Sequence, residues 1–136
     1  MLNSLTPSSA ESKIRELIEN WAAAVRIRDI DAIIAHHSEN IVMYDVPEPF
    51  ESIGLDAYRK TWDLFFKYTK PGVFDILDLH ITADEYVAFS YAKMKCEDKS
   101  QSTEYTTLNF RLTIGFKKIN NQWFFTHEHH SIPALQ

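Results

Sequence analysis

The segment at positions 103–118, TEYTTLNFRLTIGFKK, alternates apolar and polar residues, and this pattern limits the possible folds more than any other feature of the chain. Its apolar residues are Leu108, Phe110, Leu112, Ile114 and Phe116, and they alternate with Thr107, Asn109, Arg111, Thr113 and Gly115. Successive side chains of a strand point to opposite faces, so the pattern predicts a strand with one apolar and one mixed face. Another layer of structure must cover the apolar face.

Three further segments of the second half have the same strand-like composition. They are GVFDILDLHIT at 72–82, EYVAFSYAKMK at 85–95 and QWFFTHEHHS at 122–131. Each is rich in β-branched and aromatic residues, and short polar breaks separate them. We therefore expect four long strands in the second half of the chain.

The first half has the spacing of helices instead. In SSAESKIRELIENWAAAVRIRD, at 8–29, Ser8 and Glu11 form a capping pattern, and the apolar residues that follow recur at helical intervals. These apolar residues are Ile14, Leu17, Ile18, Trp21 and Val25. The segment predicts an amphipathic first helix.

Two more helices and a strand are expected before position 70. Asp29 or Asp31 can cap a second, short helix that ends near His36 and His37. The segment NIVMYDVPEPF, at 40–50, reads as a strand stopped by its prolines, and a third helix follows Gly54. Its apolar side contains Leu55, Tyr58, Trp62, Phe65 and Phe66. The sequence thus predicts an α+β fold, with three N-terminal helices packed on one face of a curved, mainly antiparallel β-sheet.

Composition excludes several classes of protein. The 136 residues are 45% hydrophobic, which suits one domain spanning 1–136 with a substantial core. A net charge of −5 has the wrong sign for binding nucleic acid. The single cysteine, Cys96, cannot form an internal disulfide. No apolar run approaches the roughly 18 residues of a membrane span, and the opening MLNSLTP lacks the basic residues that begin a targeting segment. We expect a cytoplasmic protein with no nucleic-acid or membrane partner.

The order of elements resembles a known family. The stretches WAAAVRIRDIDAI, VMYDVPEPFESIGLDAYRKTW and RLTIGFKKINNQWFFTHEHHSIP, at 21–33, 42–62 and 111–133, are similar to SnoaL-like and ketosteroid isomerase-like proteins of the NTF2-like superfamily. The resemblance covers nearly the whole chain and implies an NTF2-like cone. Because members of this superfamily host many activities in one cavity, it specifies the fold more closely than the reaction.

The resemblance places Asp45 at the position of the general-base aspartate of ketosteroid isomerase. A carboxylate at a strand end in an apolar cone suits removal of a proton beside a carbonyl group. The alternative is that Asp45 only caps the turn before Pro47. The donors that stabilise the enolate oxygen in ketosteroid isomerase correspond to Trp21 and to a position at or near Ile114, which do not replace them. We therefore do not expect steroid isomerisation.

The segment HEHHS, at 127–131, gathers three of the six histidines. Strand geometry puts His127 and His129 on one face, and Glu128 and His130 on the other. A two-residue turn at Asn120 and Asn121 would pair Ile114 with His127, whereas a three-residue loop would turn Glu128 and His130 toward the face of Ile114. The residues alone do not decide between the two-residue turn and the three-residue loop. The orientation given by a three-residue loop is usual in the family that the chain resembles. We therefore expect Glu128 and His130 to point inward, where one of them could act as a second acid or base.

The same histidines do not predict a metal site. Two histidines at i and i+2 can bind an ion only if a third ligand converges, and the spacing of His36, His37 and His80 does not require this. The simpler interpretation is hydrogen bonding with Glu128, Arg111 and backbone groups at a sheet end or subunit contact. We expect no metal and no cofactor.

The remaining candidate residues are pocket walls. We expect Trp21, Met43, Trp62 and Phe65 to bind an apolar ligand, with Asp45 near them, although core packing would also explain these residues. The resemblance implies a small-molecule-binding protein, namely an isomerase, cyclase or hydrolase acting on an apolar carbonyl compound. The alternative is a non-catalytic ligand-binding or assembly module. A homodimer through the outer face of the sheet is also expected, since family members often pair in this way.

Overall fold

A computed structural model describes residues 8–134, so the opening MLNSLTP lies outside the described residues. The helices are α1 (Ser9–Ile27), α2 (Ile30–Ile34) and α3 (Leu55–Tyr68), and the strands are β1 (His37–Tyr44), β2 (Ser52–Ile53), β3 (Thr69–Ala83), β4 (Val87–Asp98), β5 (Thr106–Ile119) and β6 (Gln122–Ser131). The α+β class is confirmed. The expected position of the helices is only partly right, because α3 follows β1 and β2 and stands in the middle of the chain.

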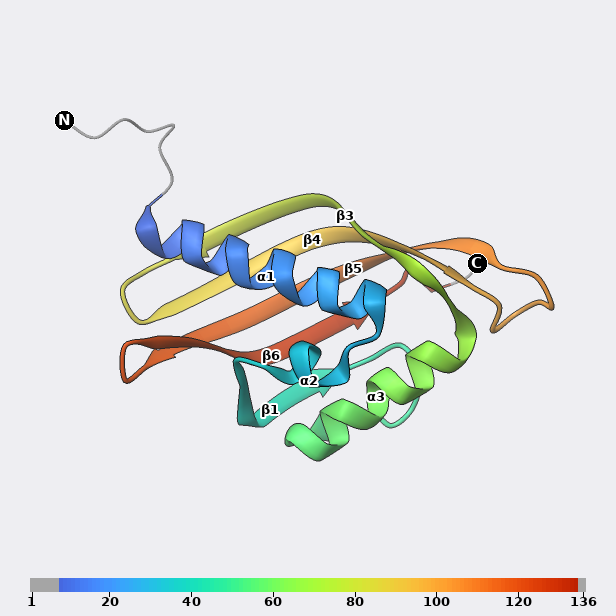
Figure 1. Cartoon of the computed structure of the whole chain (residues 1–136), viewed down its shortest axis with the longest axis horizontal. Coiled ribbons are helices and arrows are strands. Elements are labelled where there is room, and N and C mark those ends of the chain that lie inside the picture. The colour runs from blue at the N-terminus through green and yellow to red at the C-terminus, as the bar shows by residue number, and fades with distance from the viewer. Residues whose placement is uncertain (1–7, 135–136) are drawn as a thin grey trace.

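The six strands form one curved sheet in the order β2-β1-β6-β5-β4-β3. All neighbours are antiparallel except β1 and β6, which run parallel. Figure 1 shows α1 lying across the concave face, with α2 and α3 beside the β1 end of the sheet. In the described part of the chain, no helix is long and apolar enough to cross a membrane.

The first helix forms as its sequence predicts. The Ser8 side chain accepts a hydrogen bond from the Glu11 N–H at 3.0 Å, and the expected apolar stripe is buried against the sheet. Arg28 ends the helix in the left-handed conformation, and its guanidinium donates to the carbonyls of Phe66 and Thr69. Arg28 therefore ties the end of α1 to the junction between α3 and β3.

The short second helix ends earlier than expected. Asp29 caps α2 by accepting a hydrogen bond from the Ala32 N–H at 3.2 Å, and the helix stops at Ile34. His36 adopts a positive φ of 59°, which turns the chain so that His37 already begins β1. This turn places the side chain of His37 inside the protein rather than on a helix surface.

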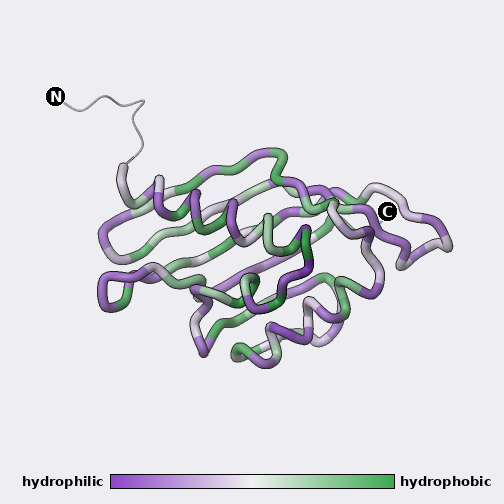
Figure 2. Tube along the Cα trace, in the orientation of Figure 1, coloured by the Kyte–Doolittle hydropathy of each residue, from purple (hydrophilic) through white to green (hydrophobic). Residues whose placement is uncertain are grey.

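The alternation along β5 is confirmed. The apolar set that includes Phe110, Leu112 and Ile114 is buried, while Thr107, Asn109, Arg111 and Thr113 are exposed on the outer face. The tube in Figure 2 shows the same alternation of hydrophobic and hydrophilic residues along the long strands. The inner face of the sheet therefore forms the core with α1 and α3.

The hairpin between β5 and β6 differs from the expected one. Asn120 and Asn121 have positive φ values of 50° and 65° and form a two-residue turn, with Ile119 opposite Gln122. The register then shifts, because Phe116 pairs with Phe125 but Gly115 pairs with His127, which leaves Thr126 as an extra residue in a β-bulge. The predicted three-residue loop is wrong.

The bulge nevertheless produces the favoured orientation of β6. Ile114 lies opposite Glu128, and Leu112 lies opposite His130, on the buried face. His129 is exposed on the other face. The prediction that Glu128 and His130 point inward is thus confirmed, through a different local structure.

Candidate functional site

A cavity of about 230 Å³ lies between the C-terminal half of α3, the end of β1 and the inner face of β4, β5 and β6. Its lining is mainly apolar and includes Met43, Trp62, Phe65, Cys96, Leu108, Phe110 and Ile132. Asp45 and His130 also line it. A mainly apolar pocket with a few converging polar groups has the composition of a small-molecule site, and this one falls below the usual range of about 300–1,000 Å³.

Asp45 enters this cavity from the end of β1. Its side chain is partly exposed, and its Oδ1 accepts a hydrogen bond from the N–H of Val46 at 2.8 Å. The structure records no other hydrogen bond to this carboxylate among the described residues. Asp45 therefore stabilises its own turn and also keeps an oxygen available to a ligand, so the two interpretations of this residue are compatible.

His130 is the second polar group of the cavity. Its imidazole is stacked on Phe110, with ring centroids 5.8 Å apart, and meets the edge of Trp62 at 6.2 Å. The residue is 8% exposed, so it is buried beside these two aromatic side chains. They hold the ring in the wall of the cavity.

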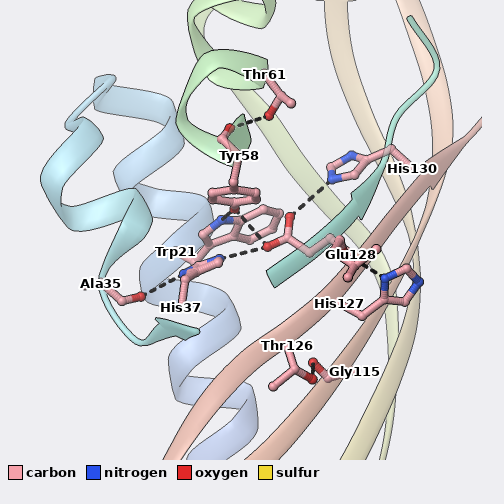
Figure 3. A network of polar contacts seen from close by, with 11 residues as sticks. Trp21, Ala35, His37, Tyr58, Thr61, Gly115, Thr126, His127, Glu128 and His130 are labelled. Carbon is pink, nitrogen blue, oxygen red and sulfur yellow. Dashed lines mark hydrogen bonds and ion pairs between the residues drawn. The ribbon is translucent and has the colours of Figure 1, made fainter. Parts of the chain in front are cut away.

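Behind His130 lies a fully buried carboxylate, Glu128 (Figure 3). Its Oε2 is 2.8 Å from Nε2 of His37 and accepts a hydrogen bond from the Tyr58 hydroxyl, also at 2.8 Å. Its Oε1 is 3.4 Å from Nε2 of His130. Glu128 is not among the residues that line the cavity, and its contact with His130 links it to the cavity wall.

The surroundings of Glu128 keep it ionised. Burial by itself raises the pKa of this carboxyl group, but the hydrogen bonds from His130 and His37, followed by the electrostatic contributions of these two side chains, outweigh that effect. The pKa of Glu128 falls from 4.5 to about 2. The site thus holds a negative charge that is paired with histidine and shielded from water.

Tyr58 completes this buried cluster. Its hydroxyl accepts a hydrogen bond from Nε1 of Trp21 at 3.1 Å and donates one to Glu128. Burial, followed by the negative charge of Glu128, raises the pKa of Tyr58 well above 10, so the phenol keeps its proton. Nε1 of Trp62 is also buried, and its N–H makes no hydrogen bond with the described residues.

The structure separates the predicted ligand-binding residues into two groups. Met43, Trp62 and Phe65 line the cavity, as does Asp45. Trp21 does not line it, because this side chain is buried behind Trp62 with its N–H directed to Tyr58. Trp21 therefore supports the wall of the cavity rather than forming it.

The other two histidines of HEHHS lie apart from the cavity. Nδ1 of His127 is 2.7 Å from the Val42 carbonyl, and the rings of His127 and His129 both meet Tyr44 edge-on. Arg111 donates to the Ser131 hydroxyl on the same outer face. Within residues 8–134 there is no group of three or more His, Cys, Asp or Glu side chains arranged to hold a metal ion.

Sequence reasoning missed His37 and Tyr58. The parallel pairing of β1 with β6 brings His37 opposite Phe125, and their rings stack with centroids 4.1 Å apart. Tyr58 lies on the apolar side of α3, one turn before Trp62, and was interpreted as a core residue. A polar atom at the tip of a residue on an otherwise apolar stripe is the signal that could have identified Tyr58, since a buried hydroxyl requires a partner.

Comparisons with known proteins agree with this architecture. The sequence profile described as a SnoaL-like domain matches residues 14–135. An NTF2-like protein of unknown function from Pseudomonas putida KT2440 is 34% identical, with a TM-score of 0.82 over 93% of this chain and 89% of that one. A ketosteroid isomerase-like protein from Erwinia carotovora atroseptica is 15% identical, with a TM-score of 0.78 over 95% of this chain and 100% of that one, a likeness of fold alone. A search of curated proteins found no match.

Proposed function

Because the chain belongs to the SnoaL-like domain family, whose members share the NTF2-like fold, we propose that its cavity binds a small apolar carbonyl compound and transfers a proton on it. Asp45 acts as the general base in this proposal. It removes a proton from the carbon beside the carbonyl group, and the electron pair of the broken C–H bond moves into an enolate. His130, with Glu128 behind it, acts as the second acid or base.

One observation carries the proposal. The cavity is open to a ligand and reaches both Asp45 and His130, whereas a scaffold would have a packed cone with no room beside its polar residues. The walls formed by Trp62, Phe65 and Phe110 suit an apolar or aromatic ligand. The carbonyl carbon of such a ligand would lie within the same space as the two acid-base groups.

A second observation favours the non-catalytic alternative. Enolate formation needs donors aimed at the oxygen where negative charge develops. Nε1 of Trp21 is committed to Tyr58, and Ile114 is a buried hydrocarbon side chain, so neither supplies such a donor. A ligand-binding module with the same cavity would not need one.

The experiment separates these functions with a small aromatic ketone, indanone. Binding is measured by the change in tryptophan fluorescence, and exchange of the hydrogens beside the carbonyl for deuterium is followed by NMR. We expect wild-type protein to accelerate the exchange and Asp45→Asn to reduce the acceleration by about 100-fold or more, the typical contribution of a general base.

A matched control is available in the turn after β3. Oδ1 of Asp84 accepts a hydrogen bond from the N–H of its own successor, Glu85, as Asp45 does from Val46, but Asp84 is exposed and far from the cavity lining. Asp84→Asn should leave the exchange rate unchanged. Indanone that binds without any accelerated exchange would favour the ligand-binding module.

A further inference from the structure

The hydrogen bonds around His37 determine where its protons lie. Nδ1 of this ring is 2.8 Å from the carbonyl oxygen of Ala35, and Nε2 is 2.8 Å from Oε2 of Glu128. A carbonyl oxygen can only accept, so Nδ1 carries a proton. Nε2 faces the carboxyl group of Glu128, so His37 and Glu128 form a buried hydrogen-bonded pair.

The carboxyl group of Glu128 also contacts His130. The unprotonated Oε1 of Glu128 faces Nε2 of His130 at 3.4 Å, so Nε2 is the nitrogen that carries the proton of a neutral His130 ring. Its Nδ1 then bears a lone pair, and the described residues provide no donor to it. The ring lines the cavity, so a ligand there is the remaining source of a donor to Nδ1.

Several other polar groups of the cavity are acceptors as well, whereas Trp62, which also lines it, has a buried N–H donor with no partner among the described residues. Asp45 contributes a carboxylate. The hydroxyls of Thr61 and Thr69 donate to the carbonyls of Tyr58 and Phe65, at 2.6 and 2.7 Å, so their remaining capacity is to accept. Among the described residues no lysine or arginine lines the cavity, and Asp98 adds a second acidic group. A carboxylate ligand would therefore meet negative charge without a cationic partner.

We propose that the natural ligand carries a hydroxyl or N–H group that donates to Nδ1 of His130, and that the buried pair of His37 and Glu128 sets this preference. The inference rests on the proposed function and narrows its substrate class to hydroxyl- or amine-bearing apolar carbonyl compounds. Glu128 and His37 are positioning residues in this scheme. They act on the ligand only by fixing the proton on Nε2 of His130.

The first test needs no ligand. In protein labelled with ¹⁵N-histidine, two-bond ¹H–¹⁵N correlation spectra distinguish the two neutral tautomers from imidazolium, and single histidine substitutions assign the signals. We expect His130 in the Nε2–H form. Finding His130 in the Nδ1–H form would overturn the inference.

The second test uses a matched set of ligands. Unsubstituted indanone is compared with indanones that carry one ring hydroxyl, one methoxy group or one carboxylate at the same carbon. We expect at least one hydroxyl isomer to bind about 5- to 100-fold more tightly than its methyl ether, because the ether leaves the buried acceptor without a donor. The carboxylate should bind most weakly.

The variant His130→Phe separates the two proposals. It removes Nδ1 but keeps an aromatic ring beside Phe110, so the advantage of the hydroxyl ligand should disappear while unsubstituted indanone still binds. If this variant does not fold, the hydroxyl ligand is added to wild-type protein and the chemical shift of His130 Nδ1 is measured instead. A chemical shift that does not change refutes the inference. Equal binding of hydroxyl and methoxy ligands also refutes it, but leaves the proposed function standing. Failure of every indanone to bind overturns the proposed function and this inference with it.

Discussion

Replacing Glu128 by glutamine should destabilise the protein strongly at neutral pH. The change keeps the shape of the side chain but removes the charge that pairs with His37, and it turns an acceptor oxygen into an amide that faces the Tyr58 and histidine donors. Breaking a buried ion pair by removing one partner commonly costs about 3–5 kcal/mol. We expect the free energy of unfolding to fall by an amount in this range.

The lowered pKa gives the pH dependence of this effect. A pKa difference of one unit corresponds to about 1.4 kcal/mol, so lowering the pKa of Glu128 from 4.5 to about 2 stabilises the fold by about 3 kcal/mol. Because the folded pKa lies below the unfolded one, this stability is fully present above pH 4.5 and is lost as the pH falls toward 2. The difference between wild type and Glu128→Gln should therefore shrink across this interval.

The assay is urea denaturation followed by far-ultraviolet circular dichroism, at pH 7 and at steps down to pH 3. Glu104→Gln is the matched control, because Glu104 is exposed and its side chain forms no ion pair with the described residues. The control should stay within about 0.5 kcal/mol of wild type at every pH. A cost below 1 kcal/mol for Glu128→Gln at pH 7, or a cost that does not change with pH, would refute the reasoning.

Three other predictions concern separate parts of the molecule. The thiol of Cys96 is buried, and its pKa is raised to about 12, first by burial and then by Asp98 and Glu97. A thiol reagent at pH 8 should therefore label native protein at least about 100-fold more slowly than urea-unfolded protein, and equal labelling rates would contradict this prediction. Purified protein should not turn over an unsaturated 3-ketosteroid, because losing even one oxyanion donor commonly costs about 100- to 1,000-fold; robust turnover abolished by Asp45→Asn would show the contrary. Light scattering should give the mass of a homodimer formed through the outer face of the sheet. The variant Tyr91→Glu, on that face, should give the mass of a monomer. A monomer mass for wild-type protein at micromolar concentrations would exclude the dimer.

The sequence was most informative where side-chain periodicity reports directly on burial. The apolar stripe of α1, the cap at Ser8 and the alternation along β5 all depend on residues close together in the chain, and all were predicted correctly. These features determine the layers of the fold and the face on which the cavity lies. Periodicity could not predict the contact of His37 with Glu128, which are 91 positions apart and meet only through the parallel pairing of β1 and β6.

The hairpin between β5 and β6 shows why the pairing register was harder to predict. Asn120 and Asn121 form a two-residue turn, but simple pairing from that turn would have placed His127 opposite Ile114. The bulge at Thr126 corrects the register, and it is stabilised by a hydrogen bond from the Thr126 hydroxyl to the Gly115 carbonyl at 3.1 Å. The bulge allows Glu128 to be buried among its hydrogen-bond partners. These partners come from distant parts of the chain, so the sequence near the bulge does not indicate this effect.

The bulge also makes one position of β6 tolerant of a change in chain length. Because Thr126 has no partner across the hairpin, a chain lacking it could still pair Phe125 with Phe116 and His127 with Gly115, and the strand beyond would keep its orientation. Inserting or deleting a residue between His127 and His130 would instead exchange the inward and outward faces of the residues that follow. Homologues whose hairpins differ by one residue can therefore conserve the buried glutamate, provided that the difference in length falls at the bulge.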